Sequence, residues 1–294
     1  RQGRNHTQTN SNNVAFARSM ANTEMTTTDA TATSPAERST GYAVVALVSG
    51  GKDSCYAMMR AVAHGHRIVA LANLHPPASS PAEMDSYMYQ TVGHTAIDAY
   101  AECMTVPLYR EEIRGRSVQQ TLQYTPRTDG DADEVEDLFR LLQKVKEAHP
   151  EMNAVSSGAV LSDYQRCRVE NVCERLGLVS LAYLWQRPQD ELLAEMIEKN
   201  VDAILIKVAA MGLDPRKHVG KHIAQLQPYF LKLNADFGFH VCGEGGEYES
   251  FTLDCPLFKK RIVLDETRLV IHSDDVFAPV GYLEIDRFHL EDKA

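Results

Sequence analysis

The sequence predicts an α/β protein with a mostly parallel sheet, followed by a smaller C-terminal α/β domain. From residue 41 onward, short apolar runs alternate with segments of helical periodicity, which is typical of βαβ units. The first run, YAVVALVS (42–49), is continuously apolar, as expected of a strand buried on both faces. The end of the chain, from residue 259, instead has the pattern of antiparallel strands.

The expected elements follow in order along the chain. Buried strands are predicted at 42–49, 67–74, 106–113, 153–161 and 179–187. The helices between them are predicted at 53–64, at about 84–104, at 134–149 and at 162–176, where Ser162 and Gln165 form an S-x-x-Q capping pattern. After Pro188 we expect a helix, the apolar run 201–209, a helix from about 220 to 237, and strands at 259–273 and 280–291.

These elements define three regions. Residues 1–39 contain almost no large apolar side chains, so we expect a disordered N-terminal extension. Residues 40–187 form the predicted nucleotide-binding domain, and residues 188–294 form a C-terminal substrate-binding and catalytic domain.

Composition excludes several function classes. The formal net charge of −10 argues against broad nucleic-acid binding, which depends on clustered Lys and Arg. No apolar run approaches the roughly 20 residues of a membrane-spanning helix. The six cysteines form no C-x-x-C pair and no zinc-ligand spacing, which favours reduced thiols in a cytoplasmic protein.

A glycine-rich turn between the first strand and the first helix is the main chemical motif. A strand, a glycine turn and a helix together offer backbone N–H groups and the positive end of a helix to an anion. The sequence matches neither G-x-x-x-x-G-K-[ST] nor G-x-G-x-x-G. It reads SGGKDS and comprises Ser49, Gly50, Gly51, Lys52, Asp53 and Ser54. This motif resembles the PP-loop of ATP pyrophosphatases, which cleave ATP between its α and β phosphates.

Each residue type in this motif suits that chemistry. The two glycines let the backbone approach phosphates closely, and the two serines add hydroxyl donors. Lys52 can place a positive charge on the departing pyrophosphate. Asp53 is poorly suited to contact phosphate directly, and we assign it to a Mg²⁺ ion.

Two further segments contain residues that we assign to ligand binding rather than to packing alone. In SGAVLSDYQRCRVENVCERLGL (157–178), we assign Gly158 and Arg166 to ATP binding, with a structural salt bridge as the alternative for Arg166. In HVCGEGGEYESFTLDCP (240–256), three glycines stand among acidic residues, which predicts a shaped loop after a strand. Such an acid-lined loop suits a cation, an amine or ammonia, although a plain surface turn is the alternative.

Together with IRGRS, LAYLWQR and CGEGGEYESFTLDCPLFKK, these motifs resemble the diphthine–ammonia ligase family from about residue 42 to the end. The resemblance implies a substrate, translation elongation factor 2 carrying diphthine, a modified histidine. It also implies that ATP and ammonium convert the diphthine carboxylate to an amide through an acyl-adenylate, giving diphthamide, AMP and pyrophosphate.

The resemblance leads to specific roles. Lys52 and Asp53 would act on the phosphates, and Glu244 or Glu247 would hold ammonium or accept its proton. Aromatic faces and carboxylates bind the trimethylammonium group of diphthine well. The substrate-binding candidates are Tyr87, Tyr89, Tyr183, Trp185, Gly245, Gly246 and Glu249.

Two alternatives stay open. One is a PP-loop enzyme that modifies tRNA, against which the acidic charge and the missing C-x-x-C pair argue. The other is a non-catalytic ATP sensor on the same fold, against which the intact Lys52, Asp53 and Arg166 argue.

Overall fold

A computed structural model describes residues 41–77, 88–126 and 133–293. The expected disordered extension, residues 1–39, lies outside the described residues. Residues from 41 onward belong to a single compact unit. Within the described ranges, no helix is both long enough and apolar enough to cross a membrane.

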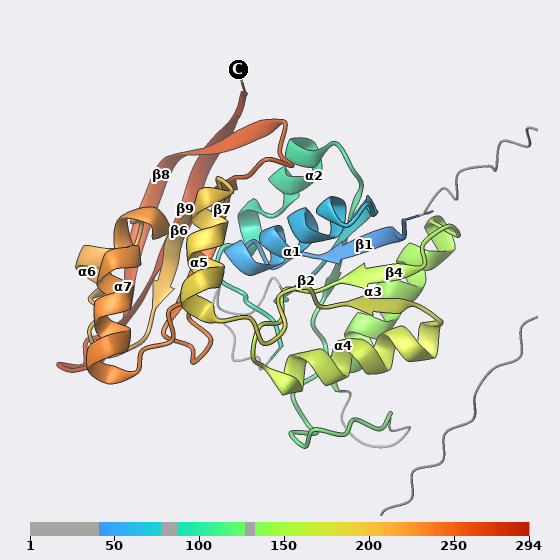
Figure 1. Cartoon of the computed structure of the whole chain (residues 1–294), viewed down its shortest axis with the longest axis horizontal. Helices are drawn as coiled ribbons and strands as arrows, with labels where there is room; N and C mark the ends of the chain where they lie inside the picture. Colours follow the sequence, from blue (N-terminus) through green and yellow to red (C-terminus); the bar gives the residue numbers. More distant parts are fainter. Residues whose placement is uncertain (1–40, 78–87, 127–132, 294) are drawn as a thin grey trace, which may run out of the picture. The chain divides into compact units, whose positions relative to one another are not determined.

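The first half of this unit is a parallel five-stranded sheet covered by helices on both faces (Figure 1). The strand order is β3-β2-β1-β4-β5, and every neighbouring pair is parallel. The strands are β1 (Ala43–Leu47), β2 (Arg67–His75), β3 (Leu108–Glu112), β4 (Ala154–Ser156) and β5 (Val179–Leu181). The helices are α1 (Lys52–Ala63), the 3-10 turn η1 (His94–Ala96), α2 (Asp98–Met104), α3 (Glu134–Ala148) and α4 (Asp163–Leu176).

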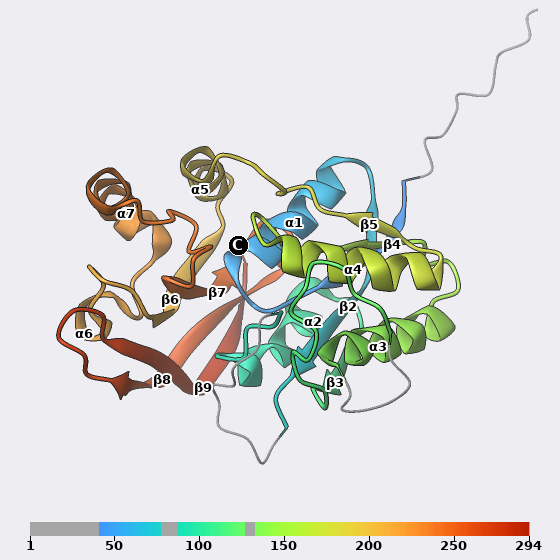
Figure 2. The same ribbon diagram turned by 90° about the horizontal axis from the view of Figure 1, so that it is seen from below.

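The second half is a four-stranded antiparallel sheet with its own helices. The strand order is β7-β6-β9-β8. The strands are β6 (Asp202–Val208), β7 (Tyr248–Asp254), β8 (Lys260–Ser273) and β9 (Val280–Asp292). The helices are α5 (Gln189–Glu198), α6 (Pro215–His218) and α7 (Ile223–Phe237), and Figure 2 shows α5 and α7 on the same side of this sheet. The α/β prediction with a second domain is therefore confirmed, while the boundary between residues 187 and 188 stays a prediction.

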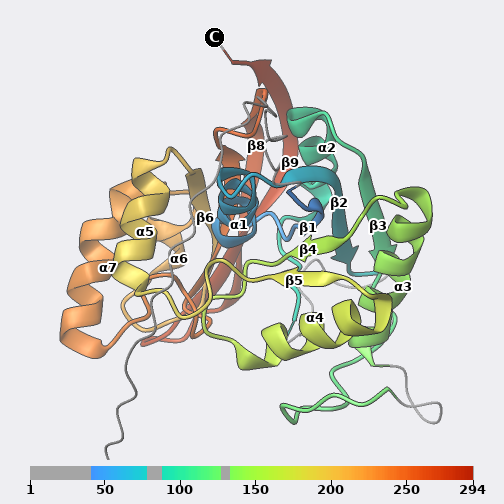
Figure 3. The same ribbon diagram turned by 45° about the vertical axis from the view of Figure 1, so that its right-hand side comes forward.

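The apolar core explains how the layers join. One buried cluster lies between the parallel sheet, at Val45 and Val155, and helices α3 and α4. A second cluster joins the opposite face, at Ala46 and Leu71, through α1 and α2 to Phe251 of the antiparallel sheet. Figure 3 shows α1 and α2 on the side of the parallel sheet that faces β8 and β9. Helix α1 is thus in contact with both sheets, which places its N-terminus between them.

Three sequence predictions need correction. The helix expected at about 84–104 begins only at Asp98 within the described residues, because the chain turns at Gly93 with φ of +84°. Strands β4 and β5 are shorter than the predicted 153–161 and 179–187, because the chain leaves the sheet after Ser156 and Leu181. The acidic loop follows helix α7 rather than a strand, and it precedes strand β7.

Candidate active site

The SGGKDS loop, residues 49–54, connects β1 to α1 at the carboxyl edge of the parallel sheet. Gly50 has φ of +92°, a conformation that side-chain-bearing residues rarely adopt. A Cβ atom there would lie 2.6 Å from Cδ1 of Ile97. Gly51 has φ of −75°, and the nearest atom to its Cβ would be Oε1 of Gln90 at 3.1 Å. Of these two positions, the backbone conformation therefore requires glycine only at position 50.

Strand β7, about 200 residues further along the chain, holds this loop in place. The Lys52 backbone N–H, at the first turn of α1, donates to Oγ of Ser250 over 3.1 Å. The Thr252 N–H donates to the Gly50 carbonyl over 2.8 Å, and the Tyr100 hydroxyl lies 2.8 Å from the same carbonyl. Since the N-cap residue Gly51 has no side chain, Ser250 supplies the capping oxygen.

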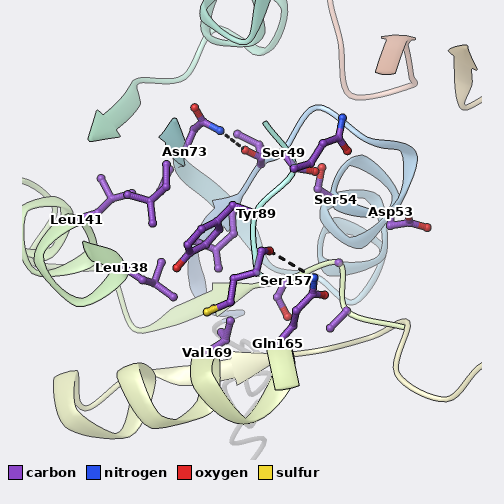
Figure 4. A pocket seen from close by; sticks show the side chains of 18 of the residues that line it. Ser49, Asp53, Ser54, Asn73, Tyr89, Leu138, Leu141, Ser157, Gln165 and Val169 are labelled. Carbon is purple, nitrogen blue, oxygen red and sulfur yellow. Dashed lines mark hydrogen bonds between the residues drawn. The ribbon is translucent and has the colours of Figure 1, made fainter. Parts of the chain in front are cut away.

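A cavity of about 210 Å³ opens beside the loop (Figure 4). It lies where β1, β2 and β4 end, the edge at which open α/β sheets bind ligands. Its polar wall consists of Ser49, Asp53, Ser54, Ser157 and Glu244, with Asn73, Gln90 and Gln165 nearby. Its apolar wall includes Leu47, Leu74, Met88, Leu138, Leu141 and Val169. The cavity therefore suits a ligand with one apolar part and one strongly polar part.

Two polar atoms of this wall are buried without a hydrogen-bond partner: Oδ1 of Asp53 and Oγ of Ser157. Ser157 is 5% exposed and lines the cavity. A buried polar atom without a partner costs about 1–3 kcal/mol, so such atoms in a cavity wall indicate a polar ligand. Within the described ranges, no group of three His, Cys, Asp or Glu residues could hold a metal.

Gly158 brings the segment after β4 directly onto the SGGKDS loop. A Cβ atom at Gly158 would lie 2.7 Å from the Ser54 nitrogen and 2.9 Å from the Asp53 carbonyl carbon. Both neighbours are backbone atoms, which cannot move aside as a flexible side chain can. The predicted nucleotide-binding residue Gly158 therefore lies against the loop and lines the cavity.

Lys52 does not line the cavity. Its side chain is 2% exposed, and Nζ donates to the Cys242 carbonyl over 2.6 Å and to Oδ2 of Asp53 over 2.9 Å. The ammonium also lies 5.0 Å from the centre of the Tyr248 ring. Burial opposes the charge on Lys52, but Asp53 and the other neighbours outweigh it and raise the pKa of the ammonium. Lys52 is thus fixed in its charged form, facing the segment before β7.

That segment, residues 240–247, is called here the glycine–glutamate loop. Its Glu244 is half-buried, lines the cavity, and accepts the Leu161 N–H over 3.1 Å. Burial, and then the Asp53 carboxylate, raise the pKa of Glu244 to about 7, although Lys52 acts in the opposite direction. A carboxyl group that titrates near neutral pH can accept and release a proton under working conditions.

Glu247 was predicted as the alternative to Glu244 for holding ammonium or accepting its proton, but its surroundings differ. It pairs with His240 over 2.9 Å and accepts the Gly245 N–H over 2.7 Å, within its own loop. It does not line the cavity, and neither do Gly245 and Gly246. The structure thus separates the two candidate bases.

Arg166 and Trp185 pack together outside the cavity lining. Arg166 pairs with Glu170 over 2.8 Å and with Asp163 over 3.2 Å, and its guanidinium lies 4.5 Å from the centre of the Trp185 ring. The salt bridge that the sequence analysis gave as the alternative is therefore present, and the assignment of Arg166 to ATP stays a prediction.

The remaining substrate candidates are dispersed. Oε1 of Glu249 forms an ion pair with Nζ of Lys207 over 3.2 Å, and the Tyr183 hydroxyl lies 2.6 Å from Nε2 of His66. Tyr87 lies outside the described residues. Tyr89 does line the cavity, with its hydroxyl 3.3 Å from the Glu134 carbonyl.

Sequence reasoning missed several residues of the site. Asn73 is 4% exposed; it donates to the Val48 carbonyl over 2.8 Å and accepts from Arg110 over 2.9 Å. A polar residue inside the apolar run RIVALANL was a usable signal for it. Ser157 likewise stands inside the predicted strand 153–161. Gln90, whose amide donates to the Ser250 carbonyl over 3.1 Å, had no comparable signal.

Comparisons with known proteins cover most of the chain. The family descriptions "Diphthamide synthase N-terminal domain" and "Diphthamide synthase C-terminal domain" match residues 42–180 and 188–290. Proteins named diphthine–ammonia ligase from Rattus norvegicus and Homo sapiens are 63% and 62% identical over 252 residues, which is 85% of this chain and 93% of each relative. The ligase of Schizosaccharomyces pombe is 54% identical over 242 residues, 82% of this chain but 39% of that longer relative.

Among solved structures, the U34-tRNA thiolase NcsA from Methanococcus maripaludis, with its [4Fe-4S] cluster, aligns over 71% of each chain. The TM-score is 0.29 and the identity is 15%, so we infer no shared chemistry from it.

Proposed function

Because the chain belongs to the diphthamide synthase family, we propose that it is a diphthine–ammonia ligase that amidates diphthine on translation elongation factor 2. ATP and ammonium are the other substrates, and diphthamide, AMP and pyrophosphate are the products. The identity of the elongation factor and a cytoplasmic location are parts of this proposal. Six cysteines that are all free thiols support a reducing compartment.

One observation supports the assignment most strongly. The cavity has an apolar wall at the ends of β1 and β2 and a polar wall at the SGGKDS loop. In this proposal the adenosine lies against the apolar wall, which includes Leu47, Leu74 and Leu141, and the phosphates lie at the N-terminus of α1. Oδ1 of Asp53 and Oγ of Ser157 would gain the partners that they lack.

Mg²⁺ fits this wall through Asp53. Protein sites for Mg²⁺ commonly use one or two carboxylates together with substrate phosphates, which agrees with a lone unpartnered Oδ1. When bound there, the ion would offset the negative charge that develops on the departing pyrophosphate. The chain's own contribution is the loop backbone and the Ser49 hydroxyl, because the Ser54 hydroxyl donates to the Gly51 carbonyl over 2.9 Å.

The reaction follows from the poor reactivity of a carboxylate toward ammonia. The diphthine carboxylate attacks the α-phosphorus of ATP, which forms an acyl-adenylate and breaks the bond to pyrophosphate. Glu244, as a carboxylate, takes one proton from ammonium, and the resulting ammonia attacks the acyl carbon. A second proton leaves nitrogen as AMP departs, which completes the amide. Glu247, bound within its own loop, is the weaker candidate for this base.

The test is release of AMP and pyrophosphate from ATP, with diphthine-bearing elongation factor 2 and ammonium each present or omitted. We expect release that depends on the factor, together with the mass change from acid to amide. The Asp53→Ala variant should lose activity, whereas Glu198→Gln, on the exposed end of α5, should keep it. Release triggered by bulk tRNA and not by the factor would overturn the proposal in favour of a tRNA-modifying enzyme.

A further inference from the structure

The buried ammonium of Lys52 joins the two halves of the described unit. An ammonium group has three N–H donors. Two of them bind the Cys242 carbonyl and Oδ2 of Asp53, and the Tyr248 ring lies beside the charge. The Lys52 side chain is 2% exposed and does not line the cavity that the phosphates would enter, and its Nζ is bonded to the glycine–glutamate loop through the Cys242 carbonyl.

The Cys242 peptide is held from its other side as well. Its N–H donates to Oε1 of Gln189 over 2.9 Å, and its thiol lies 3.2 Å from the Gln189 carbonyl. The Tyr248 hydroxyl donates to the neighbouring Val241 carbonyl over 2.7 Å. Gly243 then turns with φ of +83°. Cys242 is therefore a fixed point from which the loop turns toward the cavity.

Glu244 lies two residues beyond that fixed point and forms part of the cavity wall. Its carboxylate accepts a hydrogen bond from the Leu161 N–H over 3.1 Å. The place of Glu244 relative to Asp53 thus depends on how Cys242 is attached to α1. Within the described residues, the Lys52 ammonium is the side chain of α1 that makes this attachment.

We propose that Lys52 is a positioning residue that ties the glycine–glutamate loop to α1 and so sets where Glu244 meets ammonium, rather than a ligand of pyrophosphate. The inference rests on the proposed function for the role of Glu244, but the attachment itself does not. It replaces the sequence interpretation in which Lys52 contacts the leaving group. It also assigns phosphate binding to the backbone of the SGGKDS loop and to the Ser49 hydroxyl.

The first test needs no catalysis. Lys52→Met keeps the length of the side chain and removes its charge and donors. We expect faster amide hydrogen exchange across residues 241–247 in this variant, because the Cys242 carbonyl loses its partner. We also expect the Kd for ATP measured without Mg²⁺ to change by less than about threefold, since no phosphate contact is lost and the proposed Mg²⁺ ligand Asp53, a partner of Lys52, does not enter the measurement. Both results are required, and any other combination overturns the proposal.

Gln189→Ala is the matched variant, because it removes the hydrogen bond from the Cys242 N–H to the Gln189 side chain without touching the SGGKDS loop. It should loosen the same loop amides and leave ATP binding intact. Thermal unfolding of both variants shows whether either has simply failed to fold. Loop amides that exchange as in the wild type in a folded Gln189→Ala variant would contradict the fixed point at Cys242.

Kinetics then separates the inference from the proposed function. In the amidation assay, Lys52→Met should raise the KM for ammonium about tenfold, the order expected for one lost hydrogen bond to a charged group. Adding Glu244→Gln should cost little more, because both changes remove the same interaction. A large rise in the KM for ATP would overturn the positioning role. A wild-type enzyme without amidation activity would overturn the proposed function and leave the exchange result standing.

Discussion

The two glycines of the SGGKDS loop tolerate a side chain to different degrees. Gly50→Ala forces alanine to φ of +92° and places Cβ 2.6 Å from Ile97, which should cost about 2–4 kcal/mol of folding free energy. Gly51→Ala keeps an allowed φ and meets only the end of Gln90, so it should cost less than about 1 kcal/mol. Urea unfolding of the two variants tests this difference. Equal destabilisation would contradict the backbone argument.

Glu244 sets a pH dependence that ammonium alone would not give. The groups that face it are Asp53 and Lys52 on α1, Glu247 on its own loop, and the Leu161 N–H. Burial raises its pKa to about 7, so the carboxylate that accepts a proton is depleted below that pH and dominant above it. At saturating ATP, kcat/KM for total ammonium should rise up to about pH 7 and then level off.

Glu244→Gln provides the control for this profile. Without a base, the variant can use only free ammonia, whose fraction keeps rising with pH. Its kcat/KM should therefore be lower than that of the wild type at pH 7 and should continue to rise where the wild type is level. Two profiles of the same shape would exclude Glu244 as the proton acceptor.

At the scale of elements, β7 acts as the N-terminal cap of α1. Ser250→Ala leaves the Lys52 N–H without its capping oxygen, which should cost about 1 kcal/mol, as at other N-caps. The loss should also weaken ATP binding, because the same helix turn faces the phosphates. Ser273→Ala, at the exposed end of β8, is the control and should change stability by less than about 0.5 kcal/mol. Similar unfolding midpoints for both variants would contradict the capping role.

The sequence predicted elements well where the signal was local. Strand β1 and helix α1 follow from a continuous apolar run, a glycine turn and helical spacing, all within about 25 residues. The helix predicted at 84–104 failed at Gly93, where a Cβ atom would lie 2.7 Å from Ile206 of β6. That close approach fixes a turn, but it depends on a strand more than 100 residues away. Local periodicity carries no information about it.

The same distinction between local signals and long-range contacts applies to the candidate site. Ser49, Asp53, Ser54 and Gly158, which the local motifs singled out, all line the cavity, and their roles stay predictions. The hydrogen bonds that hold the loop come from Ser250 and Thr252, about 200 residues away, and a single sequence does not reveal such pairings. Lys52 illustrates this best. A lysine in a glycine-rich loop suggested a phosphate ligand, whereas its hydrogen bond to the Cys242 carbonyl, 190 residues away, is seen only in the folded structure.

At the scale of the whole described unit, α1 is the structural link between the parallel sheet and the C-terminal half. Its Tyr56 and Ala57 pack in the apolar cluster of α5 and α7. Beside that cluster, Glu195 of α5 accepts hydrogen bonds from the Tyr56 hydroxyl and from Arg60, and it pairs with Arg187. Because α1 begins within the SGGKDS loop, this network also helps to hold the loop in place.

Glu195 makes the stability of the link depend on pH. The hydrogen bond from Arg187 lowers the pKa of Glu195, and Tyr56 and Arg60 act in the same direction against its burial. A carboxyl group whose pKa is lower in the folded state stabilises the fold above its unfolded pKa of about 4.3, and the contribution is lost as pH falls through the folded value. Glu195→Gln should therefore cost about 1–2 kcal/mol at pH 7, and the difference from the wild type should shrink below about pH 4.

Urea unfolding at both pH values measures this difference. Glu198→Gln is the control, because Glu198 is exposed and its ion pair with Lys199, at 3.5 Å, is a weak surface contact. A cost for Glu195→Gln that is the same at both pH values would mean that packing, and not charge, joins α1 to α5.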